Sequence, residues 1–506
     1  MDFYDQIWMA FSVALDPVNL LAALIGCLAG TLVGVLPGLG PTTTITLLFP
    51  LIYKLNPVQS LITMAGIYYG AQYGGSTTSI LVNIPGESSS VVTCLDGYQM
   101  AKKGQAGPAL GISAFGSFFG GTIAVIIVML MAPPLAEMAL KFGPAENFSV
   151  MFFGITMVTY LASGSMVKSL MMGALGLSLS CIGTDMVSGR LRYTLGLVGL
   201  QDGLGIVPVA MGLFGVSEIM LNTEAKLQTT TLSTKTRLRE LFPTRKDWRD
   251  SIKPMMRGSA LGSFLGLFPG GGPTISSFIS YATEKRFSKT PEKFGTGAIE
   301  GVAGPETANN ASAGVAFIPL LCLGIPTTVA MGVLLGALMI KGVPPGPLLI
   351  RNHPELFWGV VGSMYIGNFM LLILNLPLIG LWVRILKIPF SILAPLILLF
   401  VLIGSYTSRN NVIDVLIAIV FGVVGYLMKK FGYPMAPLVL AFILGPNLEK
   451  YLGQSLISGD GSPMFFFQRP ISAAFITVAV LVLLYPVFSR WVKKRPIGLP
   501  KGDENV

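Results

Sequence analysis

The stretch GCLAGTLVGVLPGLGPT, from Gly26 to Thr42, recurs as GSALGSFLGLFPGGGPT, from Gly258 to Thr274, and the two align without a gap. In both copies glycine occupies every fourth position and a Pro-Gly-x-Gly-Pro-Thr turn follows. Glycine at this spacing leaves a smooth helix face on which another backbone can pack closely. Proline and clustered glycine then end the helix. The chain is therefore predicted to contain two copies of one unit, each with a broken helix.

A single GxxxG repeat is more often a packing motif than a binding site. The duplication and the break change that interpretation, because a helix broken within lipid must be buried in protein or line a wet cavity. Broken helices at corresponding positions in two halves of a chain are typical of transporter binding sites.

The composition predicts a membrane protein. Of 506 residues, 52% are hydrophobic and 11% are charged, and the mean hydropathy is +0.71, whereas soluble domains carry about 25% charged residues. Apolar runs such as 18–36 and 110–131 are long enough to cross a bilayer. We expect an all-α polytopic fold with about 11 to 12 crossings plus re-entrant hairpins, from the length of about 20 residues that one crossing needs.

The positive charge of +10 is distributed as expected for membrane topology rather than for nucleic-acid binding. Basic residues concentrate in 224–257 and in the tail after residue 487, and residues 1–53 contain no lysine or arginine. The positive-inside rule places the basic segments in the cytoplasm and the N-terminus outside. We therefore predict two inverted-topology repeats, 1–222 and 257–490, a cytoplasmic linker, 223–256, and a cytoplasmic tail, 491–506.

Each break is followed by a hydroxyl-rich helix start. Such an end directs free N–H groups and a positive dipole into the break, where they can bind a carboxylate, although hydroxyls there can also serve as simple helix caps. The predicted substrate-binding residues of the two breaks are Pro37, Gly38, Gly40, Thr42, Thr43 and Thr44, and Gly270, Gly272, Thr274 and Ser276.

A second polar cluster follows in each half: YGAQYGGSTTSILVNIPGESSS at 69–90 and GPETANNASAGVAFIPLLCLGIPTT at 304–328. Each cluster contains a polar patch, an apolar helix and an Ile-Pro tip. This order suggests a re-entrant hairpin in each half. Their polar groups suit an oxyanion or, through oxygen atoms, Na⁺; helix capping is the alternative. The predicted ligands are Ser76, Thr77, Thr78, Asn83, Gly86, Asn309, Asn310, Ser312, Thr327 and Thr328.

Glu87 and Glu306 are candidates for ion coupling, because carboxylates inside a membrane are costly and hence functional; exposure at a water-filled tip is the alternative. Asp185, Glu218 and Asp414 lie near the ends of apolar runs and are expected at the interface. We expect no cofactor, disulfide or metal site other than Na⁺, since the four cysteines are isolated.

The duplicated frames, YGGSTTSILVNIPGE and GPETANNA resemble the TctA family, the large membrane subunit of tripartite tricarboxylate transporters. The resemblance runs from about Leu20 to the C-terminal helices. It implies ion-gradient-driven uptake of di- or tricarboxylates such as citrate across a bacterial inner membrane. It also implies two partners, a small TctB-like membrane subunit and a periplasmic TctC-like solute-binding protein.

Other function classes fit the sequence less well. The chain has no Walker loop for an ATP-driven pump and no HExxH or GxSxG motif for an enzyme. An ion-gated anion channel and a permease for a non-carboxylate solute remain alternatives. Secondary active symport with Na⁺ or H⁺, by alternating access at a site near the midplane, is the favoured mechanism.

Overall fold

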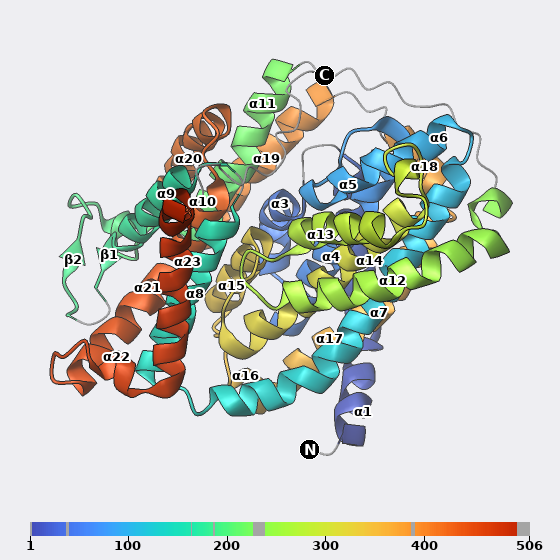
Figure 1. Ribbon diagram of the computed structural model, residues 1–506. Coiled ribbons are helices and arrows are strands. Elements are labelled where there is room, and N and C mark those ends of the chain that lie inside the picture. The colour runs from blue at the N-terminus through green and yellow to red at the C-terminus, as the bar shows by residue number, and fades with distance from the viewer. Residues whose placement is uncertain are drawn as a thin grey trace.

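The structure is a computed structural model that describes residues 3–36, 40–162, 164–185, 188–225, 238–385 and 390–492. Over these residues the chain is almost entirely helical, with one short antiparallel strand pair at the edge of the molecule (Figure 1). The elements of the N-terminal half are α1 (Phe3–Ala14), α2 (Pro17–Val35), α3 (Pro41–Tyr53), α4 (Pro57–Val82), α5 (Val91–Thr93), α6 (Gln99–Lys102), α7 (Ala106–Ala139), α8 (Pro144–Leu161), α9 (Met166–Ser180), β1 (Gly183–Thr184), β2 (Leu191–Arg192), α10 (Ile206–Ala210) and α11 (Ser217–Ala225).

The C-terminal half contains helices and connecting turns, and no strand in the part that the structure describes. Its elements are α12 (Arg245–Gly266), α13 (Pro273–Phe287), α14 (Glu300–Val315), α15 (Val329–Ile340), α16 (Leu349–Asn352), α17 (Pro354–Asn375), α18 (Ile379–Ile385), α19 (Phe390–Arg409), α20 (Val412–Lys430), α21 (Met435–Ser458), α22 (Phe465–Gln468) and α23 (Pro470–Val492).

Six stretches of the described chain are helical, long and apolar enough to cross a bilayer: Pro17–Val35, Ala106–Ala139, Ile206–Glu224, Pro354–Asn375, Ile392–Arg409 and Val412–Lys430. Shorter apolar helices, among them Pro41–Tyr53 and Val329–Ile340, accompany them. The predicted fold class, an all-α polytopic membrane protein, is confirmed. The number of crossings stays a prediction.

The first glycine frame packs α2 against α4. A Cβ added to Gly26 would collide with the backbone of Thr63, and a Cβ added to Gly34 would collide with the backbone of Ala71. Eight residues separate the two glycines on α2 and eight separate their partners on α4, in the same order along the chain. The two helices therefore run in the same direction. The glycine stripe is what permits this contact, because any side chain would separate the two backbones.

The second frame repeats this arrangement. A Cβ on Gly258 would meet the backbone of Gly304, and one on Gly266 would meet the backbone of Ser312, so α12 and α14 are also parallel. Figure 1 shows α12, α13 and α14 beside α4 near the middle of the molecule. The two sequence copies thus form the same helix pair, as a duplicated unit should.

After each break the chain reverses its direction. Arg257 on α12 donates from Nε to Glu284 on α13 over 2.9 Å, so the two helices lie side by side as a hairpin. In the first copy the Ser60 hydroxyl, near the start of α4, donates to the carbonyl oxygen of Ile52, near the end of α3, over 2.9 Å. Helices α2 and α4 are parallel and α3 connects the end of one to the start of the other. The chain in α3 therefore runs in the opposite direction to both. The two helix hairpins that contain the breaks are therefore α2–α3 and α12–α13, and the re-entrant hairpins expected at 69–90 and 304–328 stay a prediction.

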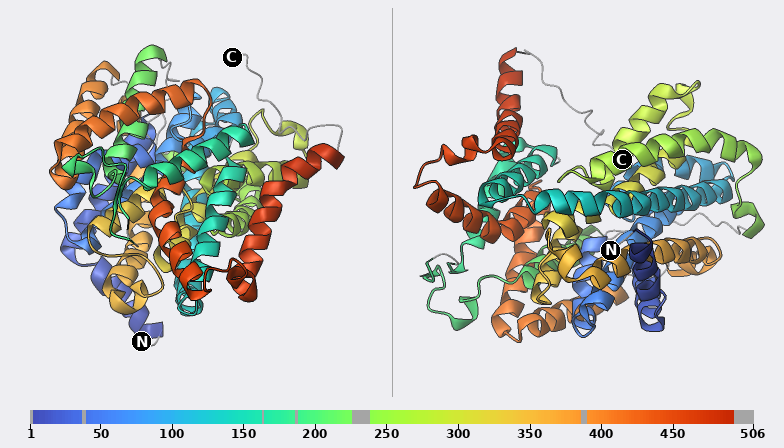
Figure 2. Two further views of the ribbon diagram at one scale, coloured as in Figure 1. Left: turned by 90° about the vertical axis from the view of Figure 1, so that its left-hand side faces the viewer. Right: turned by 90° about the horizontal axis from the view of Figure 1, so that it is seen from below.

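Helices α4 and α14 form the centre. Ser60–Val82 of α4 and Gly301–Val315 of α14 are buried on every side, which explains why their sequences show no amphipathic stripe. The long helix α7 passes along α14 and crosses the right-hand view of Figure 2. Helices α8, α21 and α23 pack together in a separate group.

The predicted division into repeats and linker stays a prediction. Residues 226–237 of the linker and 493–506 of the tail lie outside the described residues. The basic residues from Arg245 to Arg257 stand on α12, whose capping box at Thr244 and Asp247 starts the helix.

Candidate functional site

The helices that follow the two breaks begin in the same way. Gly40 precedes Pro41 at the start of α3, Gly272 precedes Pro273 at the start of α13, and neither start has a side-chain cap. In α3 the N–H of Thr44 donates to the carbonyl of Gly40 over 3.2 Å. In α13 the N–H of Ser276 donates to the carbonyl of Gly272 over 3.1 Å. The N–H groups before them have no acceptor within the helix, as at every helix start. Each start therefore offers uncapped donors and a positive dipole end.

The two Ile-Pro tips also share a conformation. Asn83 ends α4 with φ 62°, and Gly324 stands at the corresponding place with φ 68°, each immediately before Ile-Pro. Gly86 packs on the carbonyl oxygen of Gly34, where no Cβ fits. In the second half the N–H of Gly270 donates to the carbonyl oxygen of Thr327 over 3.0 Å. Each tip therefore closes on the break of its own half.

Both breaks and both tips meet at one cavity of about 570 Å³. The halves touch across it, with the hydroxyls of Ser88 and Thr274 3.0 Å apart. Sequence segments more than 180 residues apart are thus joined at one site. The cavity is lined by Gly40, Pro41, Thr42, Thr43, Tyr68, Gln72, Pro85, Gly86, Glu87, Ser88, Val158, Phe214, Glu218, Gly270, Gly272, Pro273, Thr274, Ile275, Thr327, Thr328, Val329, Ala330, Lys429, Ala436 and Leu440.

Nine of the predicted substrate-binding residues line this cavity, and so does the predicted coupling residue Glu87. Pro37 and Gly38 lie outside the described residues. The nine are Gly40, Thr42, Thr43, Gly86, Gly270, Gly272, Thr274, Thr327 and Thr328.

Several other predicted ligands bond to backbone nearby. The Thr44 hydroxyl donates to the carbonyl of Gly40 over 2.9 Å and the Ser276 hydroxyl to that of Gly271 over 3.1 Å. The Thr78 hydroxyl donates to the carbonyl oxygen of Val35 over 2.6 Å, which ties α4 to the end of α2. These hydroxyls bond to backbone carbonyl groups around the breaks.

The remaining polar residues of the two clusters are distributed differently. Thr77 is buried at a small separate void beside Tyr73, and Asn83 is exposed. Ser312 is buried on α14 against Gly266, and its hydroxyl has no hydrogen-bond partner in the described part of the chain. None of these three lines the large cavity.

Glu306 is the centre of a buried hydroxyl network. The Ser76 hydroxyl donates to its Oε2 over 2.6 Å, the Ser117 hydroxyl to the same oxygen over 3.4 Å, and the Thr93 hydroxyl to its Oε1. The Asn310 amide donates to the Ser117 hydroxyl over 2.7 Å and to the carbonyl of Glu306 over 3.1 Å. Residues of α4, α5, α7 and α14 thereby satisfy one carboxyl group inside the bundle. Predicted site residues from both halves meet here, away from the cavity wall.

Glu87 connects the cavity with this interior. Gln72 and Asn309 lie beside its carboxyl group, yet its buried Oε1 has no hydrogen-bond partner among the described residues, nor do the amide oxygen and nitrogen of Asn309. Buried polar groups are normally paired. An oxygen-rich, unpaired group of this kind can bind a small cation or a proton.

Two charged residues of the cavity wall escaped the sequence interpretation. Glu218, expected at the interface, and Lys429 line the cavity and form an ion pair. They stand on α11 and α20, far from both sequence clusters. No motif marks them, because a lysine at the end of an apolar run resembles an ordinary interface residue.

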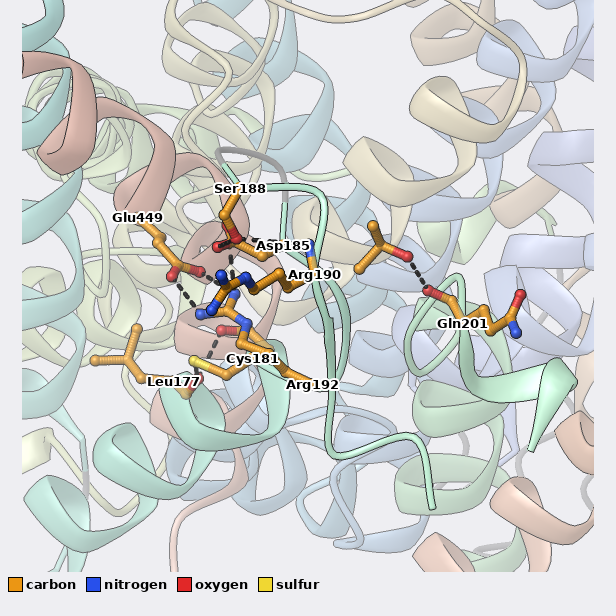
Figure 3. A network of polar contacts seen from close by, with 10 residues as sticks. Leu177, Cys181, Asp185, Ser188, Arg190, Arg192, Gln201 and Glu449 are labelled. Atoms are coloured by element: carbon orange, nitrogen blue, oxygen red, sulfur yellow. Dashed lines mark hydrogen bonds and ion pairs between the residues drawn. The ribbon is translucent and has the colours of Figure 1, made fainter. Parts of the chain in front are cut away.

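A second cavity of about 500 Å³ lies beside the strand pair. Arg192 on β2 donates to both carboxylate oxygens of Glu449, over 2.7 and 2.9 Å, and lies near Asp185 (Figure 3). Hydrogen bonding to Glu449 raises the pKa of the Arg192 guanidinium above its usual range. The pair fixes the strand pair to α21.

Duplicated helix hairpins whose uncapped starts meet at one cavity between two halves are typical of polytopic membrane proteins that transport solutes. The sequence comparisons agree with that class. Residues 20–440 match the tripartite tricarboxylate transporter TctA family, and the chain belongs to that family.

Two relatives come from Agrobacterium vitis. One, named "Uncharacterized 52.8 kDa protein in TAR-I ttuC' 3'region", is 49% identical over 489 residues, 96% of this chain and 97% of the relative. The other, "Uncharacterized protein in TAR-II ttuC' 3'region", is 50% identical over 228 residues, 44% of this chain and 94% of the relative. No solved structure matches the chain.

Proposed function

We propose that this chain is the large permease subunit of a tripartite transporter that takes up di- or tricarboxylates by secondary active transport. The observation that carries the proposal is the convergence of two uncapped helix starts, at Pro41 and Pro273, on one cavity. Helix N-termini bind anionic groups through free N–H donors and the helix dipole. The hydroxyls of Thr42 and Thr274 add donors without adding charge.

The coupling ion is proposed to bind at Glu87. Its unpaired Oε1 and the unpaired amide of Asn309 offer oxygen ligands for Na⁺ or a site for H⁺, next to the proposed substrate groups. Glu306 supports this site through its hydroxyl network. A cation held here would offset the negative charge of a bound carboxylate.

Transport is proposed to proceed by alternating access, in a bacterial inner membrane, with the N-terminus periplasmic and the basic segments cytoplasmic. A TctB-like membrane subunit and a TctC-like periplasmic solute-binding protein are the proposed partners, since the family is that of tripartite transporters.

Uptake of labelled succinate and citrate into proteoliposomes that contain both membrane subunits, supplied with the binding protein, tests the proposal. We expect accumulation above the outside concentration when an inward Na⁺ or H⁺ gradient is imposed, and none when an ionophore collapses it. Equilibration without accumulation would indicate a channel. Accumulation of an uncharged solute but of neither carboxylate would indicate a different permease.

A further inference from the structure

Lys429 is the one cationic side chain among the described residues that line the main cavity. It stands in the last turn of α20, and its Nζ pairs with Oε2 of Glu218 on α11. Glu218 is held from a second side, because the Asn222 amide donates to its Oε1 over 3.2 Å. The glutamate is thus fixed in place, whereas the flexible lysine has no other ion pair in the described part of the chain.

The charges of the cavity are unbalanced for an anionic solute. Glu87 and Glu218 contribute two carboxyl groups and Lys429 contributes one ammonium group. With the lysine paired to Glu218, a solute with two carboxylates would find uncharged donors at the two helix starts but no unpaired cation in the described lining to balance its second charge. Like charges placed together in a binding site cost affinity, and complementary charge sets specificity.

We propose that Lys429 exchanges Glu218 for the second carboxylate of the solute and so selects di- and tricarboxylates over monocarboxylates. Glu218 is the internal competitor that holds the ammonium group when the cavity is empty. The inference rests on the proposed function and adds to it a residue that determines the substrate class. A lysine ammonium suits such an exchange, since it is a point charge on a flexible stem.

The neighbouring pair supplies a matched control. Lys430, the next residue on α20, pairs with Glu224 over 2.8 Å and does not line the cavity. The side chains of Lys430 and Glu224 are about half exposed, at 48% and 53%. Lys430→Gln therefore removes a lysine from the same turn of the same helix without changing the cavity.

The test measures binding of succinate and of propionate to the purified full-length chain in detergent, by thermal-shift titration at constant ionic strength. For Lys429→Gln we expect the Kd for succinate to rise at least about tenfold, as the loss of a charge-assisted hydrogen bond predicts, with little change for propionate. For Glu218→Gln we expect tighter succinate binding, because the competitor is gone. Lys430→Gln should behave as the wild type.

A purely structural ion pair gives a different pattern. Lys429→Gln and Glu218→Gln would then weaken both ligands alike, and that result overturns the proposal. Succinate binding by the wild type together with unchanged binding by Lys429→Gln also overturns it, while leaving the carboxylate function intact. A wild-type chain that binds neither succinate nor citrate overturns the proposed function and this inference together.

Discussion

Asn83 and Gly324 show how one residue controls the shape of the site. Both adopt positive φ immediately before an Ile-Pro tip, and this turn carries Gly86 in one half and Thr327 in the other onto the cavity wall. A left-handed conformation is readily adopted by glycine and tolerated by asparagine, but it costs other residues about 1–2 kcal/mol. Asn83, whose predicted role as a ligand stays a prediction, thus also shapes the backbone of this turn.

Asn83→Ala should lower the free energy of unfolding by about 1 kcal/mol, and Asn83→Gly should leave it nearly unchanged, because only alanine is strained at φ 62°. Thermal unfolding of the two variants in the same detergent measures the difference. Equal losses in both variants would instead assign the effect to the side-chain amide.

Asn310→Ala should destabilise the protein more than it changes substrate affinity. Its amide donates to Ser117 and to the carbonyl of Glu306 inside the bundle, and removing a buried partner costs about 1–3 kcal/mol. Thr274→Val, at the cavity wall, should do the opposite and mainly raise the KM for uptake. A wild-type melting temperature for Asn310→Ala would contradict this assignment.

Among the elements, the glycine stripes determine which helices can be neighbours. Three glycines of α2 and three of α12 lie directly on the backbones of α4 and α14. The sequence predicted close packing and a break, but not the partner helix or the reversal after the break. Both of those depend on segments that are distant along the chain.

Gly262→Leu should prevent stable folding, because its Cβ would collide with the backbone of Ala308. A backbone collision cannot be relieved by a side-chain shift, so we expect a loss above the roughly 1–3 kcal/mol that is typical of overpacking. Gly380→Leu is the control, since a Cβ there meets nothing within 4 Å. The yield of monodisperse protein and its melting temperature compare the two, and similar values would refute the packing role.

In the whole molecule, the halves are joined at defined points around the cavity. Asp96, in the first half, accepts at one oxygen the N–H groups of Gly295, Gly297 and Ala298, over 2.7 to 2.9 Å, just before α14. Ser88 meets Thr274 closer to the cavity. Alternating access in which the two halves rock against each other would separate the second contact.

A chain with Ser88→Cys and Thr274→Cys, made after Cys27, Cys94, Cys181 and Cys322 are replaced by alanine, should lose uptake on mild oxidation and regain it on reduction. The hydroxyls are 3.0 Å apart, which brings the two thiols within reach of a disulfide once the backbones adjust slightly. Uptake by either single cysteine variant, whatever its level, should not change on oxidation or reduction. Full transport by the cross-linked protein would show that this contact does not open.

The sequence by itself determined the membrane class, the duplicated unit and the helix breaks. It also predicted most of the cavity-lining residues that lie within 40–43, 86–87, 270–274 and 327–328. These features follow from local chemistry: apolar length, missing N–H donors and glycine backbone. Only the tertiary structure decided that both breaks share one cavity, that the chain reverses after each, that Glu306 is enclosed by hydroxyls, and that Lys429 and Glu218 join the wall. Those facts depend on which helices pack together, and no short-range signal in the chain specifies that.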